Sequence, residues 1–254
     1  MLLAIDIGNT NITFGLYEGE NLGPRWRIRT IHDKMPDEYG ILLNQLFHHR
    51  GYEPEQVTGI AIASVVPPLT PVFQMVCWGY LRQTALVVDA RVRTGVRNRY
   101  ENPREVGADR VVDAAAVRAL YGTPACVVDF GTATTFDAVS AEGDYLGGAI
   151  APGIGISAQA LFERTAKLPR VELSRPPSAI GRNTVHSMQS GLLFGYVGLV
   201  EGMVARFKAQ LGRQTRVVAT GGLAEVIARE TEVIDVVDPW LTLHGLRIIY
   251  ELNQ

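Results

Sequence analysis

Short runs of apolar residues, each bounded by Gly, Asp or Pro, predict a chain in which strands and helices alternate. In the first part of the chain, strands are expected at residues 2–7, 12–17, 26–30, 59–65 and 85–88. Helices are expected at residues 37–49 and 69–81, where apolar residues recur at helical spacing after prolines. Strands separated by helices of this length are typical of an α/β fold with a parallel or mixed sheet.

The second part of the chain repeats this organisation. After a helix-like stretch at 109–120, strands are predicted at 125–130, 135–140 and 145–150, followed by a long helix at 184–211. The pattern ends with a strand at 216–220, a helix start at 222–229, a strand at 233–237 and a helix at 241–252. A chain of 254 residues is long enough for two small domains, so two α/β halves are predicted.

The same short unit opens each half. Residues 2–10 read Leu-Leu-Ala-Ile-Asp-Ile-Gly-Asn-Thr and residues 125–133 read Ala-Cys-Val-Val-Asp-Phe-Gly-Thr-Ala, so each is a strand followed by Asp-x-Gly and a small residue. Each continues into a second apolar strand and a turn that carries Glu-Gly, at 18–19 and at 142–143. The sequence therefore predicts one hairpin unit used twice.

These repeated turns suit the binding of metal-bound phosphate. The glycine lets backbone amides approach phosphate oxygens, the hydroxyl and amide side chains donate, and the carboxylate holds a cation directly or through water. A single Asp-x-Gly turn has an equally good structural explanation, because Asp and Gly shape turns for other reasons. Two such turns in equivalent places favour phosphate binding.

A third motif is Thr220-Gly221-Gly222, where paired glycines would let the backbone lie flat against a nucleotide. The alternative is a tight turn that needs glycine for a positive φ.

Composition and charge exclude several other classes of protein. Hydrophobic residues make up 47% and charged residues 20% of the chain, as in an ordinary soluble globular protein. The formal net charge of −2 offers no positive field for nucleic acid or an anionic membrane. Cys77 and Cys126 are far apart, which argues against a disulfide framework or structural zinc and places both in the core. Neither a Walker phosphate loop nor a dinucleotide fingerprint occurs.

The start of the chain reads as a strand and lacks the basic residues and cleavage site of a signal peptide. No uninterrupted apolar run approaches the roughly 18 residues that span a bilayer. We therefore expect a cytoplasmic protein with neither a membrane nor a nucleic acid as its partner.

Several motifs together resemble a known group of ATP-binding proteins. The segments Asp6-Ile7-Gly8-Asn9-Thr10, Asp129-Phe130-Gly131-Thr132 and Thr220-Gly221-Gly222 resemble the two phosphate loops and the adenosine loop of the superfamily that contains actin, hexokinase and the 70-kilodalton heat-shock chaperones. Within it, the chain resembles type III pantothenate kinase over nearly its whole length. Further matching motifs are Gly107-Ala108-Asp109-Arg110, residues 147–153 and Gly181-Arg182-Asn183-Thr184.

This resemblance implies an α/β fold of two ribonuclease-H-like, actin-like ATPase lobes around a nucleotide cleft. Residues 1–115 would form the lobe with the first phosphate loop, and residues 116–254 the lobe with the second phosphate loop, the adenosine loop and a dimerisation helix. The implied reaction is the ATP-dependent phosphorylation of pantothenate to 4'-phosphopantothenate, the first step of coenzyme A biosynthesis. The implied cofactors are ATP, Mg²⁺ and a monovalent cation, K⁺ or NH₄⁺.

The resemblance also implies roles for individual residues. Asp109 would be the general base, although an acid at a helix start has a structural explanation as an N-cap or first-turn residue. Asp129 would bind the monovalent cation. ATP would be bound by Asp6, Ile7, Gly8, Asn9, Thr10, Asn11, Ile12, Thr13 and Thr132. Pantothenate would be bound by Tyr100, Gly107, Ala108, Asp109, Arg110 and Thr184.

Some of these roles have alternatives at this point. Arg110 suits the carboxylate of the substrate or the transferring phosphoryl group, but could instead pair with a surface acid. Tyr100 could be a core aromatic residue, and Thr184 could be the N-cap of the long helix. The five histidines show no metal-ligand spacing, and the three tryptophans are expected to serve packing.

A two-fold homodimer is also expected. The long helix after Thr184 contains glycines at 191, 195, 198 and 202, which would let a partner helix approach closely, and the substrate site would combine Asp109 of one subunit with Thr184 of the other. The glycines could instead pack against their own sheet. Two alternatives to pantothenate phosphorylation remain: a kinase for another small polyol or sugar, and a non-catalytic nucleotide-binding regulator of the same fold.

Overall fold

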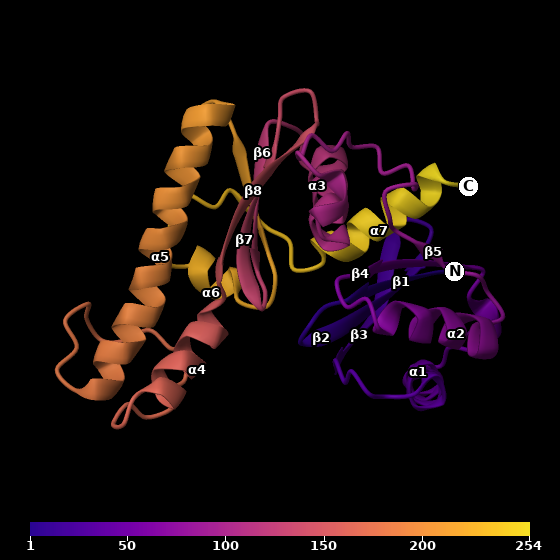
Figure 1. The fold of residues 1–254 in the computed structure, drawn as a ribbon, viewed down its shortest axis with the longest axis horizontal. Helices are drawn as coiled ribbons and strands as arrows, with labels where there is room; N and C mark the ends of the chain where they lie inside the picture. The colour runs from indigo at the N-terminus through magenta and orange to yellow at the C-terminus, as the bar shows by residue number, and fades with distance from the viewer. The chain divides into compact units, whose positions relative to one another are not determined.

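Two five-stranded sheets organise the chain, and each lies in its own unit of a computed structural model that describes residues 1–254 (Figure 1). The first unit consists of Met1–Leu120 together with Leu241–Gln254, and the second of Tyr121–Trp240. An α/β fold of two lobes is therefore confirmed, and each unit is described by itself below.

The sheet of the first unit has the strand order β3-β2-β1-β4-β5. The central strand β1 pairs antiparallel with β2 and parallel with β4. The strands are β1 (Leu2–Ile7), β2 (Asn11–Glu18), β3 (Asn21–Arg29), β4 (Gly59–Ser64) and β5 (Leu86–Val87). Because β1 and β4 run in the same direction, their carboxyl ends lie at the same edge of the sheet.

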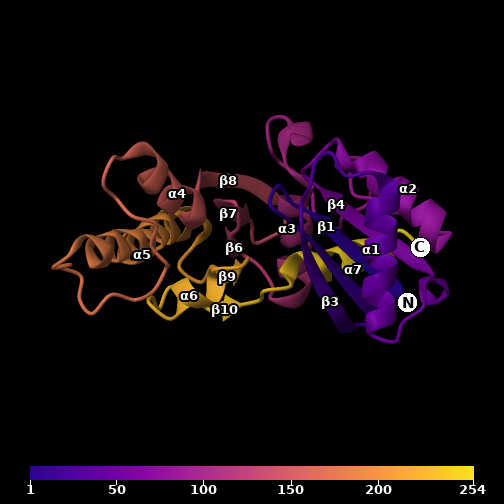
Figure 2. The same ribbon diagram turned by 90° about the horizontal axis from the view of Figure 1, so that it is seen from below.

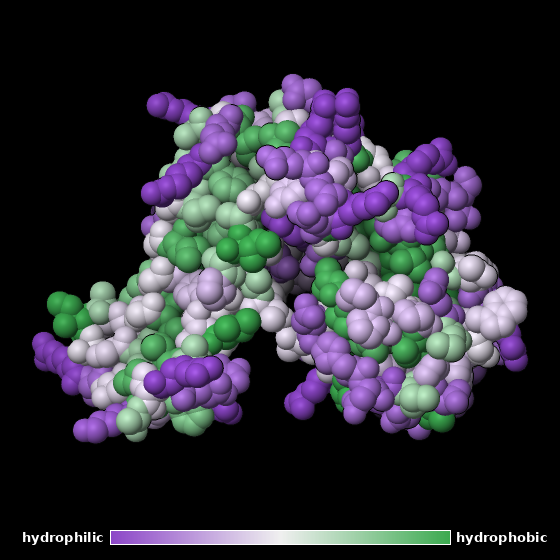
Figure 3. All heavy atoms as spheres, viewed as in Figure 1, coloured by the Kyte–Doolittle hydropathy of each residue, from purple (hydrophilic) through white to green (hydrophobic).

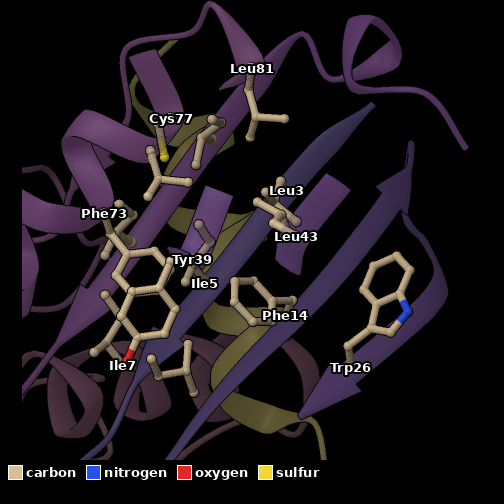
Figure 4. Packing of buried hydrophobic residues seen from close by; sticks show 14 of the residues in the cluster. Leu3, Ile5, Ile7, Phe14, Trp26, Tyr39, Leu43, Phe73, Cys77 and Leu81 are labelled. Atoms are coloured by element: carbon tan, nitrogen blue, oxygen red, sulfur yellow. The ribbon is translucent and has the colours of Figure 1, made fainter. Parts of the chain in front are cut away.

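Helices cover both faces of this sheet. On one face lie α1 (Pro36–His49) and α2 (Leu69–Leu81), and on the other α3 (Ala108–Leu120) and α7 (Leu241–Leu252). Short 3₁₀ turns occur at Pro54–Gln56 and Pro103–Glu105. Figure 4 shows the core between the sheet and α1 and α2, where Phe14, Tyr39 and Phe73 pack beside one another. On the opposite face, the ring of Tyr250 takes the space above Gly59.

The sheet of the second unit has the order β10-β9-β6-β7-β8. Its strands are β6 (Ala125–Phe130), β7 (Ala133–Val139), β8 (Tyr145–Pro152), β9 (Arg216–Thr220) and β10 (Val236–Val237). Its helices are α4 (Ile154–Arg164), α5 (Thr184–Leu211) and α6 (Ala224–Ala228). One core joins this sheet to α5, with Phe136, Val200 and Ile227 among its buried members. Figure 2 shows α5 running alongside the sheet from a second direction.

The two sheets have the same topology. In each, the first strand of the unit pairs antiparallel with the next strand and parallel with a strand that follows a crossover. The hairpin turns that carry Glu-Gly also agree, because Gly19 (φ 59°) and Gly143 (φ 83°) both adopt the left-handed conformation that glycine tolerates. The prediction of one hairpin unit used twice is confirmed.

The structure differs from the predicted elements at several places. Helix α4 was not predicted, and Ile154 is its only buried residue. Strand β3 begins at Asn21 rather than at residue 26, and β10 contains only Val236–Val237. The closing helix α7 packs in the first unit, on α3, β1 and β4. The division into lobes at residues 115 and 116 stays a prediction. The structure adds that the end of the chain, Leu241–Gln254, belongs to the first unit.

Both cysteines lie in the cores, as predicted. Burial raises the pKa of the Cys77 thiol to about 12, and burial together with the nearby Asp137 does the same for Cys126. Both thiols therefore stay protonated and unreactive at neutral pH.

Helix α5 is apolar enough and, at 28 residues, long enough to cross a membrane. Half of its most apolar window is buried inside the unit, as in the core helix of a soluble protein. Figure 3 shows pale and green residues along this helix and purple ones near both ends. The sequence predicted this helix at 184–211, but polar residues interrupt its apolar runs, so no membrane span was predicted from it.

Candidate functional site

The first Asp-x-Gly turn lies at the carboxyl end of β1. Asp6 pairs with Thr13 on β2 and with Ala63 on β4, and the amide of Gly8 donates to the carbonyl oxygen of Asn11 at 3.0 Å. Thr30 fixes this turn from β3, because its Oγ1 donates to the carbonyl oxygen of Gly8 at 2.6 Å. The turn is therefore held in one conformation at the sheet edge.

The residues of this turn divide into two groups. The side chains of Asn9, Thr10 and Asn11 are exposed and can reach a ligand. Ile7 and Ile12 are fully buried in the core, so they can offer a ligand only their backbone groups. The predicted ATP-binding set thus contains buried residues, which hold the turn in the core, as well as residues whose side chains are exposed.

Asp109 lies in the first turn of α3, close to the same edge of the sheet. A methyl group at Gly107 would lie 2.5 Å from the Oδ1 of Asp109 and 3.2 Å from Val65, so a side chain there would displace the Asp109 carboxylate. Val65 follows β4, and its amide donates to the carbonyl oxygen of Ile7 at 3.0 Å. Within the first unit, Gly107 and Val65 thereby link the candidate base to the end of β1.

Burial is the main influence on the Asp109 carboxyl group and raises its pKa above the ordinary value. The hydrogen bond from the amide of Arg110, at 2.8 Å, and the charge of Arg110 act in the opposite direction. A carboxylate with a raised pKa is a better proton acceptor than an ordinary surface aspartate. The same position in the first turn also fits a structural acid, so the geometry is compatible with both interpretations.

The other predicted substrate residues of the first unit lie around Asp109 in sequence. Arg110 is buried, so its guanidinium is not at the surface. Tyr100 is half-buried in the loop before α3, outside the hydrophobic core, and its amide donates to the Oδ1 of Asn98 at 3.0 Å. Gly107 and Ala108 are half-buried and lead directly into the helix.

The second Asp-x-Gly turn is packed against two further glycines. A methyl group at Gly153 would lie 2.7 Å from the carbonyl oxygen of Gly131, and nearer still to that of Thr132. A methyl group at Gly221 would lie 2.7 Å from the carbonyl oxygen of Phe130, and nearer still to the Oδ1 of Asp129. Gly153, which follows β8, and Gly221, which follows β9, therefore each lie close against the carboxyl end of β6 or the turn after it.

This packing places oxygen atoms against two glycines. The Asp129 carboxylate and the carbonyl oxygen of Phe130 lie against the space that a side chain at Gly221 would fill, and the carbonyl oxygens of Gly131 and Thr132 lie against the space at Gly153. Such a set of oxygens suits a hard cation. No group of three or more His, Cys, Asp or Glu residues is positioned to hold a metal, so a cation here would depend on one carboxylate and neutral oxygens.

A cavity of about 370 Å³ lies in the second unit beside the adenosine-like loop. Leu223, which follows Gly221 and Gly222, lines it together with residues of α4 and the segment after it: Ile154, Gly155, Ala158, Gln159, Phe162, Arg170, Val171 and Leu173. The lining is mainly apolar, with Gln159 and Arg170 as polar groups. Sequence reasoning did not identify this cavity, because α4 was not predicted.

Thr184 is the first residue of α5 and is exposed. The N-cap of the helix is Asn183, whose side chain accepts from the amide of His186 at 2.8 Å. The alternative interpretation of Thr184 as the N-cap is therefore wrong. Its hydroxyl remains available for a ligand.

The glycines of α5 face away from the body of the unit. Methyl groups at Gly191, Gly195 and Gly198 would meet nothing within 4 Å, and at Gly202 only the end of the Arg206 side chain at 3.3 Å. The alternative in which these glycines pack against their own sheet is therefore wrong within this chain. They form an open stripe along the helix.

Solved structures with the same fold define the class of this protein. A polyphosphate/ATP-glucomannokinase from Arthrobacter sp. strain KM superposes over 100% of this chain and 99% of its own, with a TM-score of 0.51 and 14% identity. A Campylobacter jejuni protein assigned to the Baf family of transcriptional activators superposes over 99% and 98%, with a TM-score of 0.64 and 19% identity. The ethanolamine utilization protein EutJ from Carboxydothermus hydrogenoformans gives a TM-score of 0.56 at 14% identity, over 98% and 89%. The fold is that of the actin-like ATPase and sugar-kinase group.

Sequence comparison identifies the family within this class. The profile of the type III pantothenate kinase family matches residues 2–206. Type III pantothenate kinases from Moorella thermoacetica and Roseiflexus sp. strain RS-1 are each 56% identical to the chain, over 100% of both sequences. The relative from Myxococcus xanthus is 54% identical over 100% of this chain and 99% of its own. The chain belongs to the type III pantothenate kinase family.

The close packing at Gly153 generates a stability prediction. We expect Gly153→Ala to lower the free energy of unfolding by about 1–3 kcal/mol, because the added methyl group meets backbone carbonyls that cannot move independently. Gly155→Ala is the matched control, since nothing lies within 4 Å of its methyl position. Urea unfolding of both variants measures the difference. Equal stabilities would show that Gly153 does not hold the second turn.

Proposed function

We propose that this chain transfers the γ-phosphoryl group of ATP to the primary hydroxyl of pantothenate, giving 4'-phosphopantothenate and ADP in the first step of coenzyme A biosynthesis. The observation that carries the proposal is Asp109, a half-buried acid close to the end of β1 whose pKa is raised by loss of solvent. Membership of the type III pantothenate kinase family supplies the substrate.

In this proposal Asp109 accepts the proton of the hydroxyl as its oxygen attacks the γ-phosphorus. Arg110, whose planar fork suits oxyanions, binds the carboxylate of pantothenate or the transferring phosphoryl group. Tyr100, Gly107, Ala108 and Thr184 complete the pantothenate site. Their positions beside Asp109 in sequence, or at an exposed helix start, support these roles.

ATP would be held by both repeated turns. The exposed side chains of Asn9, Thr10 and Asn11 donate to phosphate oxygens, and Thr132 does so from the second turn. The cavity beside Leu223 would take the adenosine end of the nucleotide, because a mainly apolar lining with few polar groups suits a base.

Two kinds of cation would assist. Mg²⁺ would neutralise charge on the triphosphate, and Asp6, the carboxylate of the first turn, would hold it directly or through water. A monovalent cation, K⁺ or NH₄⁺, would be held by Asp129 and the neighbouring carbonyl oxygens. A single carboxylate with neutral oxygens suits an ion of one charge. We also propose a cytoplasmic location, where ATP is available.

The most direct test is an assay of ADP release with purified protein, ATP and pantothenate. The proposal requires ADP formation that depends on pantothenate. A panel of sugars and small polyols under the same conditions covers the alternative of a different kinase. ADP release only with another acceptor would favour that kinase, and no ADP release with any acceptor would favour the non-catalytic regulator; either result would contradict the proposed substrate.

We expect Asp109→Asn to lower kcat by about 100- to 10,000-fold, the usual contribution of general acid–base catalysis. Pantothenate binding should change little, because the amide keeps the shape of the side chain but cannot accept the proton. Steady-state kinetics and calorimetry measure the two effects. Glu105→Gln, at an exposed acid in the preceding loop, should retain normal turnover. Wild-type turnover in Asp109→Asn would overturn its role as the base.

We expect Asp129→Asn to weaken or abolish activation by K⁺ or NH₄⁺, because the substitution removes the charge that attracts the ion. Replacing NaCl by KCl at constant ionic strength measures this activation. Glu225→Gln, at another exposed acid of the second unit, should keep the response of the wild type. Equal wild-type activity in both salts would show that no such site affects the reaction.

We also propose a two-fold homodimer in which α5 meets α5 along the open glycine stripe, and in which Asp109 and Thr184 of one site come from different subunits. The open space at Gly191, Gly195 and Gly198 supports close approach of a second helix. A self-complementary contact of this kind is the usual form of a two-fold interface.

Subunit mixing tests the shared site. We expect inactive Asp109→Asn and strongly impaired Thr184→Ala to regain about a quarter of wild-type activity after random exchange, because about half the dimers are mixed and each mixed dimer has one intact site. Mass spectrometry verifies the exchange. Absence of recovery after verified exchange would mean that both residues act within one subunit.

A further inference from the structure

We propose that Tyr196 of α5 is a positioning residue for the second phosphate-binding turn, and that its hydroxyl sets the affinity for ATP without contacting the nucleotide. This inference rests on the proposed function for the identity of the nucleotide. It concerns a residue that neither the repeated motifs nor the catalytic roles above include.

The hydroxyl of Tyr196 joins three elements of the second unit. It donates to the carbonyl oxygen of Pro152, the last residue of β8, at 2.7 Å. It also lies 2.5 Å from the Oγ of Ser157 in the first turn of α4. The phenol of α5 thus holds the end of β8 and the start of α4 together.

These contacts lead directly to the second turn. Pro152 pairs with Ala133, the first residue of β7, and the amide of Gly153 donates to the carbonyl oxygen of Thr132 at 3.1 Å. Gly153 also packs so closely on Thr132 and Gly131 that no side chain fits between them. A shift of Pro152 and Gly153 must therefore move Thr132, which is exposed and which the proposed function places at a phosphate.

The ring of Tyr196 does not require a hydroxyl for packing. It belongs to the core of the second unit and is 9% exposed, so phenylalanine would fill the same volume. A buried hydroxyl without hydrogen-bond partners would cost free energy. The two partners of this hydroxyl, Pro152 and Ser157, lie in the segment that packs on the second turn. The polar atom is best explained by its effect on Pro152 and the start of α4.

Tyr196 and the glycines of the open stripe lie on different faces of α5. Gly195 and Gly198 belong to the open stripe of the helix, whereas Tyr196 points into the unit. The helix therefore has one face open to a partner and one residue on its other face that fixes the ATP turn.

The test compares Tyr196→Phe with Tyr145→Phe. Both remove one buried hydroxyl from the same unit, since the Tyr145 hydroxyl donates to Asp137 at 2.9 Å at the opposite end of β8. We expect Tyr196→Phe to raise the KM for ATP about fivefold, the size of effect that one lost hydrogen bond produces. The KM for pantothenate should stay within about twofold, while Tyr145→Phe lowers the thermal stability but leaves both KM values near wild type.

Ser157→Ala gives a second readout. It should raise the KM for ATP less than Tyr196→Phe, and the double variant should resemble Tyr196→Phe, because both residues act through one linked set of hydrogen bonds. A normal KM for ATP in Tyr196→Phe, or equal rises for both substrates or in both tyrosine variants, would overturn the inference.

Calorimetric titration with ATP separates this inference from the proposed function. If the wild type binds ATP but does not phosphorylate pantothenate, the proposed substrate fails, and a weaker ATP affinity of Tyr196→Phe still supports the positioning role. If Tyr196→Phe binds ATP as tightly as the wild type, the positioning role fails while the pantothenate assay stands. If the wild type binds no ATP, both are wrong.

Discussion

The site depends on one constraint: at the carboxyl ends of both sheets, polar oxygens occupy the space that a side chain would need. The atoms that fill this space are the carboxylate oxygens of Asp109 and Asp129 and the carbonyl oxygens of residues 130–132, and the backbone opposite them is glycine at 107, 153 and 221. A methyl group at any of these glycines collides with an oxygen or with the backbone of a turn. Because glycine has no side chain, the backbone at these positions lies directly against the carboxylate and carbonyl groups of its own unit.

The shared sheet topology puts Asp6 and Asp129 at equivalent strand positions, but the residues packed around them are different. Asp6 and Asp129 end equivalent strands, yet only Asp129 is packed against a second glycine-bearing strand end at Gly221. The first unit supplies a half-buried acid instead, because Gly107 and Val65 bring Asp109 close to the end of β1. One unit thus contributes the candidate base and the other the candidate cation site. This difference follows from local packing around two sheets that have the same topology.

Much of this could be predicted from the sequence, because the signals are local. The strand, Asp-x-Gly turn and hairpin recur in both halves as short patterns, and the core strands follow from apolar runs bounded by glycine and aspartate. The remainder depends on contacts between distant residues. Helix α4 buries only Ile154, and the packing of α7 on the first unit joins residues from opposite ends of the chain. Neither the approach of Gly153 to Thr132 nor the link from Tyr196 to Pro152 leaves a pattern in the linear sequence.

The central claim is that burial beside Gly107 makes Asp109 the base of a pantothenate kinase. The most direct measurement is kcat against pH with both substrates saturating, since this profile reports ionisations within the complex and excludes those of the free substrates. Because the base must be ionised and burial raises its pKa, the account predicts that kcat falls by tenfold per pH unit below an apparent pKa above the ordinary aspartate value of 3.8. Recovery of activity on return to neutral pH controls for unfolding. A kcat that stays constant down to the ordinary aspartate pKa would contradict the account.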